Sequence, residues 1–129
     1  DVAAVAALSQ VARDEMGILV GAIRFWPIHV GAWDALLLGP VAAHPTRQGE
    51  GIGASLIRDS LWKAEHSDWD RVMLVGDAPY YKRFGFGKLE GVEMPPPTNP
   101  DRILGLDLAP NGWAGVTGEV TKWTGVPQG

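Results

Sequence analysis

A glycine-rich segment in the first half of the chain, Gln48-Gly49-Glu50-Gly51-Ile52-Gly53, holds the residues best suited to chemistry. Glycine lets the backbone approach a ligand closely, so several amide N–H groups can converge there. Where such a loop opens a helix, its unpaired N–H groups and the positive end of the helix dipole favour a phosphate or pyrophosphate. The glycines alone are equally compatible with an ordinary turn, so the neighbouring elements must decide.

Two other phosphate-binding folds are alternatives for this segment. Gly49-x-Gly51-x-x-Ala54 satisfies the looser fingerprint of dinucleotide-binding folds, with Asp77 near the expected position of a ribose-binding acid. That fold turns tightly from its strand into the first glycine, whereas five residues separate Ala43 from Gly49. The proline-rich C-terminal part also leaves little room for further alternating strands and helices. A P-loop is excluded because no Gly-Lys-Ser/Thr follows.

The elements before the glycine-rich segment are predicted to be strands. Val2–Val11 and Ile18–Trp26 are rich in β-forming residues and are joined by a tight turn, and we expect Pro27 to stop the second strand. A third strand, Ala35–Ala43, is interrupted at Gly39-Pro40, where proline cannot donate a ladder hydrogen bond. We therefore expect a bulge or bend at that break.

Beyond Gly51 the pattern changes to a helical one. An apolar face with residues such as Leu56 and Leu61 predicts a helix that ends near His66-Ser67. Prolines make Met94–Pro100 a surface loop. The other predicted elements are a strand at Val72–Val75, a short helix from Pro79 to Phe84, and late strands at Ile103–Leu108 and Ala114–Trp123.

Two motifs in this order resemble those of the GNAT family of N-acetyltransferases. Val41-Ala42-Ala43-His44-Pro45 followed by Gln48–Gly53 is similar to strand 4 of the family and its Gln/Arg-x-x-Gly-x-Gly/Ala signature. Gly76–Phe86 resembles the family's later helix, whose tyrosine precedes the glycine of a Gly-Phe pair by four residues, and Tyr81 occupies that place. The resemblance runs from about Val2 to Phe86.

The resemblance implies an α/β (α+β) fold with a mixed, mostly antiparallel central sheet, flanked by helices and containing a splayed, bulged strand. It implies that residues 1–129 form a single acetyltransferase domain. Members of the family normally carry a strand and two helices before the segment that starts here, so we expect an N-terminal piece to be missing. Those helices help to form the acceptor pocket in the family.

The family's function implies an acetyl-CoA-dependent enzyme that transfers an acetyl group directly to a primary amine of a small molecule or peptide. By position, Tyr81 would be the catalytic general acid that protonates the departing thiolate, although an aromatic packing role is the alternative. The backbone of Val41 and Ala43 would contact the pantetheine and acetyl region. The amides expected to hold the pyrophosphate of coenzyme A belong to Gln48, Gly49, Glu50, Gly51, Gly53 and Ala54.

The general base is not evident, because the segment Ala35–Ala43 lacks the acid that the family often carries in strand 4. Asp34, His29 and His44 are candidates, and a water chain or an amine that arrives neutral is as plausible. Because no general base is evident, a second function is an alternative, namely that of a non-catalytic acyl-CoA-binding or sensory domain. The acceptor amine itself is not specified by the sequence.

The amino-acid composition limits the classes of ligand and the cellular compartment to be expected. The net charge of -4 argues against a nucleic-acid surface, and no apolar run suffices to cross a membrane. The absence of cysteine fits the cytoplasm, and the three histidines show no metal-ligand spacing, so we expect no metal. Exposed late strands would allow a homodimer.

Overall fold

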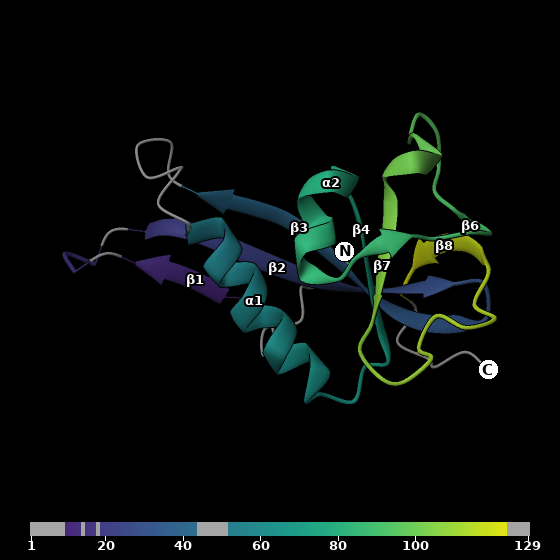
Figure 1. The fold of residues 1–129 in the computed structure, drawn as a ribbon, viewed down its shortest axis with the longest axis horizontal. Coiled ribbons are helices and arrows are strands. Elements are labelled where there is room, and N and C mark those ends of the chain that lie inside the picture. Colours follow the sequence, from purple (N-terminus) through teal and green to yellow (C-terminus); the bar gives the residue numbers. More distant parts are fainter. Residues whose placement is uncertain (1–9, 14, 18, 44–51, 124–129) are drawn as a thin grey trace.

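The computed structural model describes residues 10–13, 15–17, 19–43 and 52–123 (Figure 1). Strands and helices alternate irregularly along this part of the chain, with one long helix and several short ones. In chain order the elements are β1 (Gln10–Arg13), β2 (Leu19–Val30), β3 (Trp33–Ala43), α1 (Ile52–Glu65), β4 (Arg71–Val75), α2 (Ala78–Tyr81), the 3-10 helix η2 (Lys82–Phe84), β5 (Gly87–Lys88), β6 (Val92–Glu93), the 3-10 helix η3 (Pro100–Arg102), β7 (Ile103–Asp107) and β8 (Gly118–Lys122).

The described strands form one mixed sheet in the order β5-β7-β4-β3-β2-β8-β6, with β1 paired to β2. β3 pairs with β4 in parallel, as β6 does with β8, and the other pairs are antiparallel. The mostly antiparallel sheet flanked by helices is therefore confirmed. The short strands β5 and β6 were not predicted, since two residues are too few to show a pattern.

Apolar side chains form two buried clusters, and successive residues of a strand point to opposite faces of the sheet. On β4, Val72 and Leu74 join one buried cluster and Met73 joins another. α1 packs against β1, β2 and β3. Its buried Leu56 and Leu61 lie in the first cluster, as the helical pattern predicts. Burying each such leucine contributes about 1.5–3 kcal/mol.

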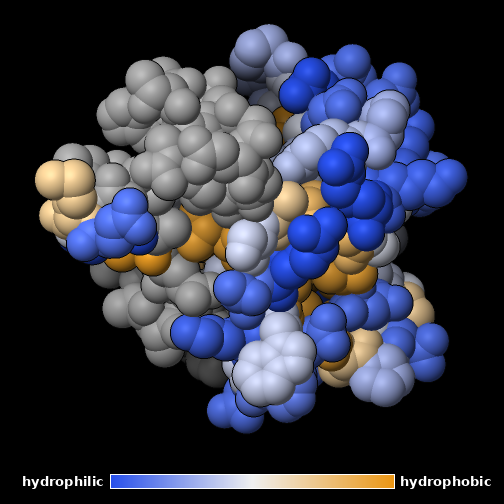
Figure 2. Space-filling view, turned by 60° about the vertical axis from the view of Figure 1, so that its left-hand side comes forward, coloured by the Kyte–Doolittle hydropathy of each residue, from blue (hydrophilic) through white to orange (hydrophobic). Residues whose placement is uncertain are grey.

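The outer side of α1 is polar. Arg58, Asp59, Lys63 and Glu65 are exposed. Figure 2 shows mainly hydrophilic residues over the right-hand part of this view, with hydrophobic residues visible between them and beside the grey atoms. The helix ends as predicted, where the backbone N–H groups of His66 and Ser67 bond to carbonyls of the last turn. Among the described residues, no helix is long and apolar enough to cross a membrane.

The expectation that Pro27 ends its strand is wrong, because β2 runs through it to Val30 and Pro27 pairs with Leu36 on β3. The other edge of β2 explains the tolerance. β1 pairs with β2 as far as Ile23 and β8 pairs from Ile28, so no described strand is in register with Pro27 on that side. A missing N–H is tolerated where it faces an unpaired edge.

The boundaries of several other elements differ from the predictions by a few residues. β1 begins at Gln10 within the described residues, and the predicted start at Val2 lies outside them, as does Ile18. The late strands are confirmed but shorter, at Ile103–Asp107 and Gly118–Lys122. The Met94–Pro100 segment is an irregular loop up to Pro100, which opens η3.

Candidate active site

A β-bulge interrupts β3 at the predicted place. Ile23 on β2 faces Val41, but Phe25, two residues on, faces Leu38, so β3 carries one extra residue between these pairs. Gly39 lies within the bulge at φ 149, a backbone conformation that favours glycine. The indole Nε1 of Trp26 donates a hydrogen bond to the Gly39 carbonyl oxygen at 2.7 Å. The predicted break in the strand is thus confirmed.

The bulge separates β3 from its parallel neighbour β4. The two strands pair only at Leu36 with Val72 and at Leu37 with Met73 among the described residues. Beyond Leu37, no described strand pairs with this edge of β3, and the ribbons of β3 and β4 run apart (Figure 1). The backbone of β3 that contains Val41 and Ala43 therefore lies on the part of the strand that has parted from β4.

The N-terminus of α1 lies just beyond this end of β3 in the chain. Gln48, Gly49, Glu50 and Gly51 lie outside the described residues, as does His44. Gly53 and Ala54 are in the first turn of α1, where backbone N–H groups have no partner within the helix. The first turn contains no acidic residue, so no carboxylate there opposes an anion.

Tyr81 comes from α2, which directly follows β4. Asp77 caps this short helix, since its carboxylate accepts a hydrogen bond from the Tyr80 backbone N–H at 3.3 Å. β3 and β4 are parallel, so their C-terminal ends meet at the same end of the sheet. The elements that follow them, α1 and α2, consequently begin at that end. Topology thus brings together the bulged strand, the helix terminus and Tyr81.

The ring of Tyr81 is held in place from several sides. It meets Tyr80 and Phe86 edge-on, with ring centroids 5.0 and 6.0 Å apart, and packs against the first buried cluster. A Cβ atom on Gly76 would lie 2.6 Å from Cε2 of Tyr81, so the ring fills the space beside this glycine. Sequence reasoning missed Gly76, although a glycine between a strand and a helix cap was a usable signal.

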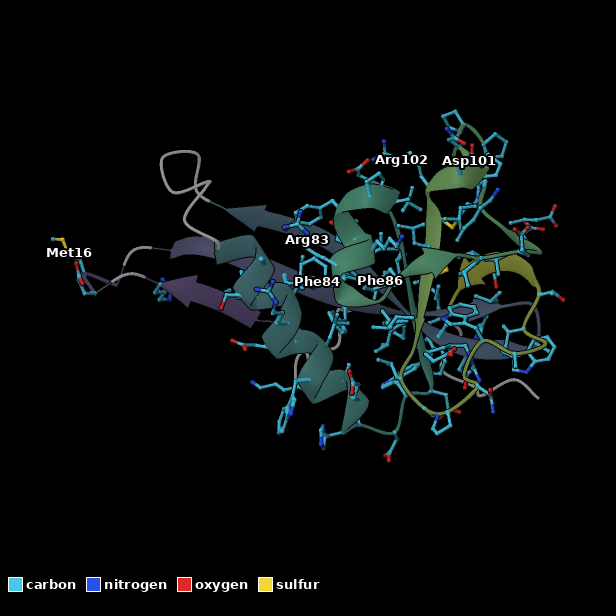
Figure 3. The ribbon with its side chains drawn as sticks, viewed as in Figure 1. Met16, Arg83, Phe84, Phe86, Asp101 and Arg102 are labelled. Atoms are coloured by element: carbon cyan, nitrogen blue, oxygen red, sulfur yellow. The ribbon has the colours of Figure 1, made fainter. Side chains whose placement is uncertain are left out.

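The pKa of the Tyr81 phenol is raised above its ordinary value, chiefly because the side chain is partly buried. The neighbouring Tyr80 and Asp77 also raise the pKa, whereas the positive charge of Arg102 lowers it. Arg102 lies on η3, and its backbone carbonyl accepts from the Gly76 N–H at 2.9 Å. At neutral pH the phenol keeps its proton and is able to act as an acid. Figure 3 shows Arg102 on the side of the molecule where α2 lies.

Two of the three candidates for the general base lie far from Tyr81 along the sheet. His29 and Asp34 face each other across β2 and β3, and His29 Nδ1 is 3.1 Å from Asp34 Oδ1. Gly39 is five positions beyond Asp34, which corresponds to about 17 Å of extended strand. The pair therefore lies at the opposite end of β3 from the bulge. The short spacing in sequence between Asp34 and Gly39 does not reveal this distance.

The described residues offer no metal centre, because no group of three His, Cys, Asp or Glu among them is arranged to hold an ion. The groups that the described arrangement offers are strand backbone, a helix N-terminus and a protonated phenol. Such a set suits an anionic ligand that lies against strand backbone and releases a leaving group that needs a proton.

Comparisons with known proteins agree with this arrangement. A family model described as an acetyltransferase (GNAT) domain matches residues 7–88. The uncharacterized N-acetyltransferase YhbS of Escherichia coli is 31% identical over 81 residues, which cover 61% of this chain and 48% of that protein. The uncharacterized N-acetyltransferase YjhQ of Escherichia coli is 38% identical over 89 residues, which cover 66% and 49%.

Two solved structures are similar to most of the described fold. One is YhbS from Escherichia coli in complex with CoA, with a TM-score of 0.82 and 26% identity over 89% of this chain and 66% of that one. The other is a GNAT family acetyltransferase from Brucella melitensis in complex with acetyl-CoA, with a TM-score of 0.67 and 32% identity over 90% and 66%. The chain spans about half the length of the curated relatives and 66% of each of these structures.

Proposed function

Since the chain belongs to the GNAT acetyltransferase family, we propose that it binds acetyl-CoA where β3 parts from β4 and transfers the acetyl group to an amine. The single observation that carries this proposal is the one-residue bulge in β3 at the end of the sheet where α2 presents Tyr81. The CoA and acetyl-CoA complexes of YhbS and the Brucella melitensis protein support it. The acceptor is a primary amine of a small molecule or peptide.

The pantetheine arm would lie along β3 beyond the bulge. An extended ligand with amide groups can pair with a strand edge as an added strand does. Val41 and Ala43 are two residues apart, so their N–H and C=O groups point to the same edge of β3. We assign them the contacts with the pantetheine and acetyl region, and the Gly39 kink keeps β4 from occupying that space.

The pyrophosphate would bind at the N-terminus of α1. Gly53 and Ala54 contribute backbone N–H groups of the first turn, and the helix dipole adds a favourable field there. Gln48, Gly49, Glu50 and Gly51 complete the cradle in this proposal. The absence of an acid in the first turn of α1 supports the assignment, because a carboxylate there would repel the ligand.

In the reaction, the amine nitrogen attacks the thioester carbonyl carbon, the C–N bond forms and the C–S bond breaks. Tyr81 donates its phenolic proton to the leaving sulfur, and its raised pKa keeps that proton available at neutral pH. The proton that the nitrogen loses when the amide forms passes through water and restores the Tyr81 phenol. Holding amine and thioester together supplies up to about 7–11 kcal/mol in well-oriented systems. His29 and Asp34 lie at the far end of β3, so we propose that the amine enters neutral or loses its proton to water.

Calorimetric titration with acetyl-CoA tests the binding site. Gly53→Glu places a carboxylate in the first turn of α1 and should weaken binding at least about tenfold. Ala114→Glu adds the same charge at an exposed position outside this region and should bind as the unchanged protein does. Equal affinities for the two variants, or no binding to the unchanged protein, would contradict the proposed site.

Turnover distinguishes the enzyme from a non-catalytic acyl-CoA-binding or sensory domain. The observation that favours the second function is that His29 and Asp34 lie away from the bulge, while Asp77, the described acid near Tyr81, caps α2. A coupled assay for free CoA thiol against a panel of amines decides between them. Release of thiol that depends on one class of amine supports the transferase, whereas binding without release across the panel supports the sensor.

A further inference from the structure

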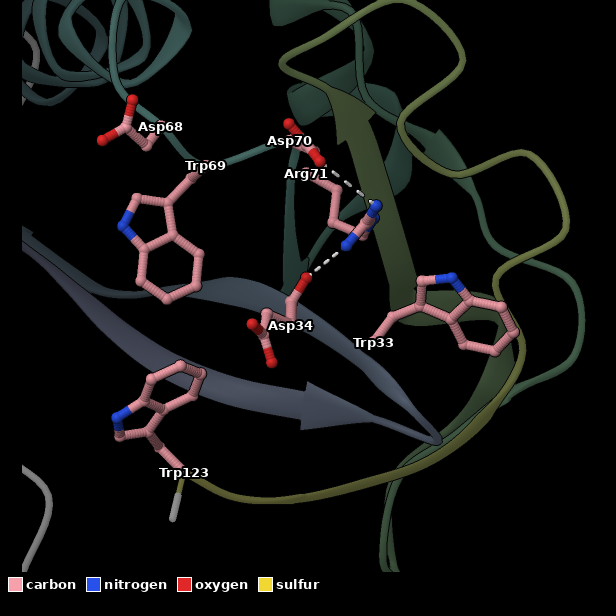
Figure 4. A pocket seen from close by; sticks show the side chains of 7 residues that line it. All are labelled: Trp33, Asp34, Asp68, Trp69, Asp70, Arg71 and Trp123. Carbon is pink, nitrogen blue, oxygen red and sulfur yellow. Dashed lines mark hydrogen bonds and ion pairs between the residues drawn. The ribbon is translucent and has the colours of Figure 1, made fainter. Parts of the chain in front are cut away.

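A cavity of about 420 Å³ lies beside the start of β3, away from the bulge. Figure 4 shows the side chains that line it. Three tryptophans contribute to its wall, namely Trp33 at the start of β3, Trp69 just before β4 and Trp123 just after β8. Asp34 lies among them. We propose that this pocket binds an alkylammonium ion at a site separate from that of acetyl transfer.

The aromatic wall is built to face a cation. The rings of Trp69 and Trp123 are 5.6 Å apart and tilted by 58°. The buried His29 stacks on Trp123 with centroids 4.8 Å apart, which fixes the orientation of that indole. The face of an indole carries negative electrostatic potential and attracts an ammonium group within about 6 Å. Trp33 remains 38% exposed on the opposite side of the pocket.

The Asp34 carboxylate points toward the space beside Trp69 and Trp123 (Figure 4). Its side chain is 27% exposed, and His29 Nδ1 bonds to Oδ1 at 3.1 Å. The bond from His29 orients this carboxylate, whose negative charge belongs to the lining of the pocket. An ammonium ion in the pocket would thus meet two aromatic rings and a carboxylate that its neighbour already orients.

Among the described residues of the lining, Arg71 is the one cation, and it does not neutralise the pocket. The guanidinium of Arg71 is 11% exposed and donates to the backbone carbonyl oxygens of Asp34 and Gly112. It also lies 3.7 Å from the Asp70 carboxylate. Asp68 adds a third carboxylate to the lining. Three carboxylates against one guanidinium give the described part of the wall net negative charge, which favours a cationic ligand over an anion or a neutral one.

The chemistry of the wall favours an organic cation over a metal ion. No group of three potential ligands is arranged for a metal in the part of the chain that the structure describes. Indole rings attract alkylammonium groups but do not coordinate hard metal ions, which take oxygen ligands. The site is independent of the proposed acetyl transfer, since Asp34 is about 17 Å from the bulge along β3.

Titration of the protein with choline, followed by the indole N–H signals in a ¹H–¹⁵N spectrum, tests the proposal. Choline should shift the Trp69 and Trp123 signals, with a Kd in the millimolar range. The Trp62 and Trp113 signals provide the internal control, because these residues do not line the pocket. The neutral analogue 3,3-dimethylbutan-1-ol has nearly the same shape and should bind at least about fivefold more weakly.

Two variants refine the test. Asp34→Asn keeps the size of the side chain but removes its charge and should weaken choline binding at least about fivefold, while acetyl-CoA binding stays unchanged. Asp68 is exposed, so Asp68→Asn affects folding less than Asp34→Asn does. It should also weaken choline binding. Asp59→Asn, on the exposed face of α1, is the matched control and should have no effect.

Equal shifts with choline and its neutral analogue would overturn the proposal, as would an absence of shifts at Trp69 and Trp123. Unchanged choline affinity in both pocket variants would do the same. Loss of acetyl-CoA binding in the Gly53→Glu protein has no bearing on these outcomes, so the two proposals fail independently.

Discussion

The indole N–H of Trp26 on β2 and the carbonyl of Gly39 on β3 are joined by a hydrogen bond of 2.7 Å across the bulge. An extra residue in a strand disrupts the local ladder and leaves backbone groups without their strand partners. The indole satisfies one of these groups and ties the irregular part of β3 to β2. Trp26 therefore stabilises the conformation in which β3 has parted from β4.

Replacing Trp26 by phenylalanine should destabilise the bulge, since the ring stays but the donor is lost. We expect a loss of about 1 kcal/mol in the free energy of unfolding and weaker acetyl-CoA binding. Denaturant unfolding and calorimetry measure the two effects. Trp62→Phe is the control, because Trp62 is 62% exposed on α1. Unchanged stability and affinity in Trp26→Phe would show that the bulge holds without this bond.

Gly76→Ala should displace Tyr81, because the new Cβ would lie 2.6 Å from its ring and 3.0 Å from Cδ1 of Leu74. We expect a destabilisation of about 1–3 kcal/mol from overpacking. Turnover should fall more than acetyl-CoA affinity, since the phenol moves while the binding elements stay. Gly87→Ala is the matched control, with no atom within 4 Å of the added carbon. A normal kcat in a folded Gly76→Ala protein would contradict a catalytic role for Tyr81.

Tyr81→Phe should lower kcat by about 100-fold or more, if the phenol supplies the proton for the leaving thiolate. Acetyl-CoA affinity should change little, because the proposed binding groups are backbone atoms. Tyr80→Phe removes the adjacent hydroxyl and serves as the control. An unchanged kcat in Tyr81→Phe would leave Tyr81 a packing residue, in keeping with its contacts to Phe84 and Phe86.

The raised pKa of Tyr81 also predicts a pH dependence. A phenol whose pKa is higher in the folded than in the unfolded protein contributes stability below the ordinary tyrosine pKa of 10.0, and this contribution disappears as the pH rises through the folded value. Activity should fall over the same range, because the phenolate cannot donate a proton. The chain has two tyrosines, so tyrosinate absorbance compared with Tyr81→Phe isolates the titration.

Arg102 allows a second test of the Tyr81 titration, because its charge acts on the pKa of Tyr81 in the opposite direction to burial. Its positive charge lowers the pKa of Tyr81, so Arg102→Ala should raise the pKa further and move the alkaline loss of activity to higher pH. The exposed Arg83→Ala, on the helix that follows α2, removes an equal charge for comparison. A downward shift of the alkaline limb in Arg102→Ala would contradict the electrostatic assignment.

The sequence predicts features of the site that depend on local backbone conformation better than it predicts which distant residues lie close together. The Gly39-Pro40 break, the end of α1 near His66 and the short helix after Gly76 all follow from local steric and hydrogen-bonding rules. The expectation for Pro27 is wrong because the tolerance of a proline in β2 depends on which strands lie beside it, which is a tertiary property.

Residues that meet only through the fold could not be predicted from local patterns. His29 and Asp34 were candidates for the base because their types suit proton transfer, yet strand register puts them at the end of β3 away from the bulge. Trp69 and Trp123 line one pocket although 53 intervening residues separate them in the printed sequence. The packing of the Tyr81 ring beside Gly76 likewise depends on how α2 folds back toward β4.

Asp77 has two effects that substitutions can separate. Its carboxylate caps α2 and its negative charge raises the pKa of Tyr81. Asp77→Asn keeps a capping oxygen but removes the charge, so stability should hold while the pKa of Tyr81 falls. Asp77→Ala removes both and should also cost about 1 kcal/mol of unfolding free energy. Thermal unfolding and the tyrosinate titration measure the two effects. Equal stabilities of the two variants would mean that the 3.3 Å bond to the Tyr80 N–H contributes nothing, and the electrostatic effect of Asp77 would then stand alone.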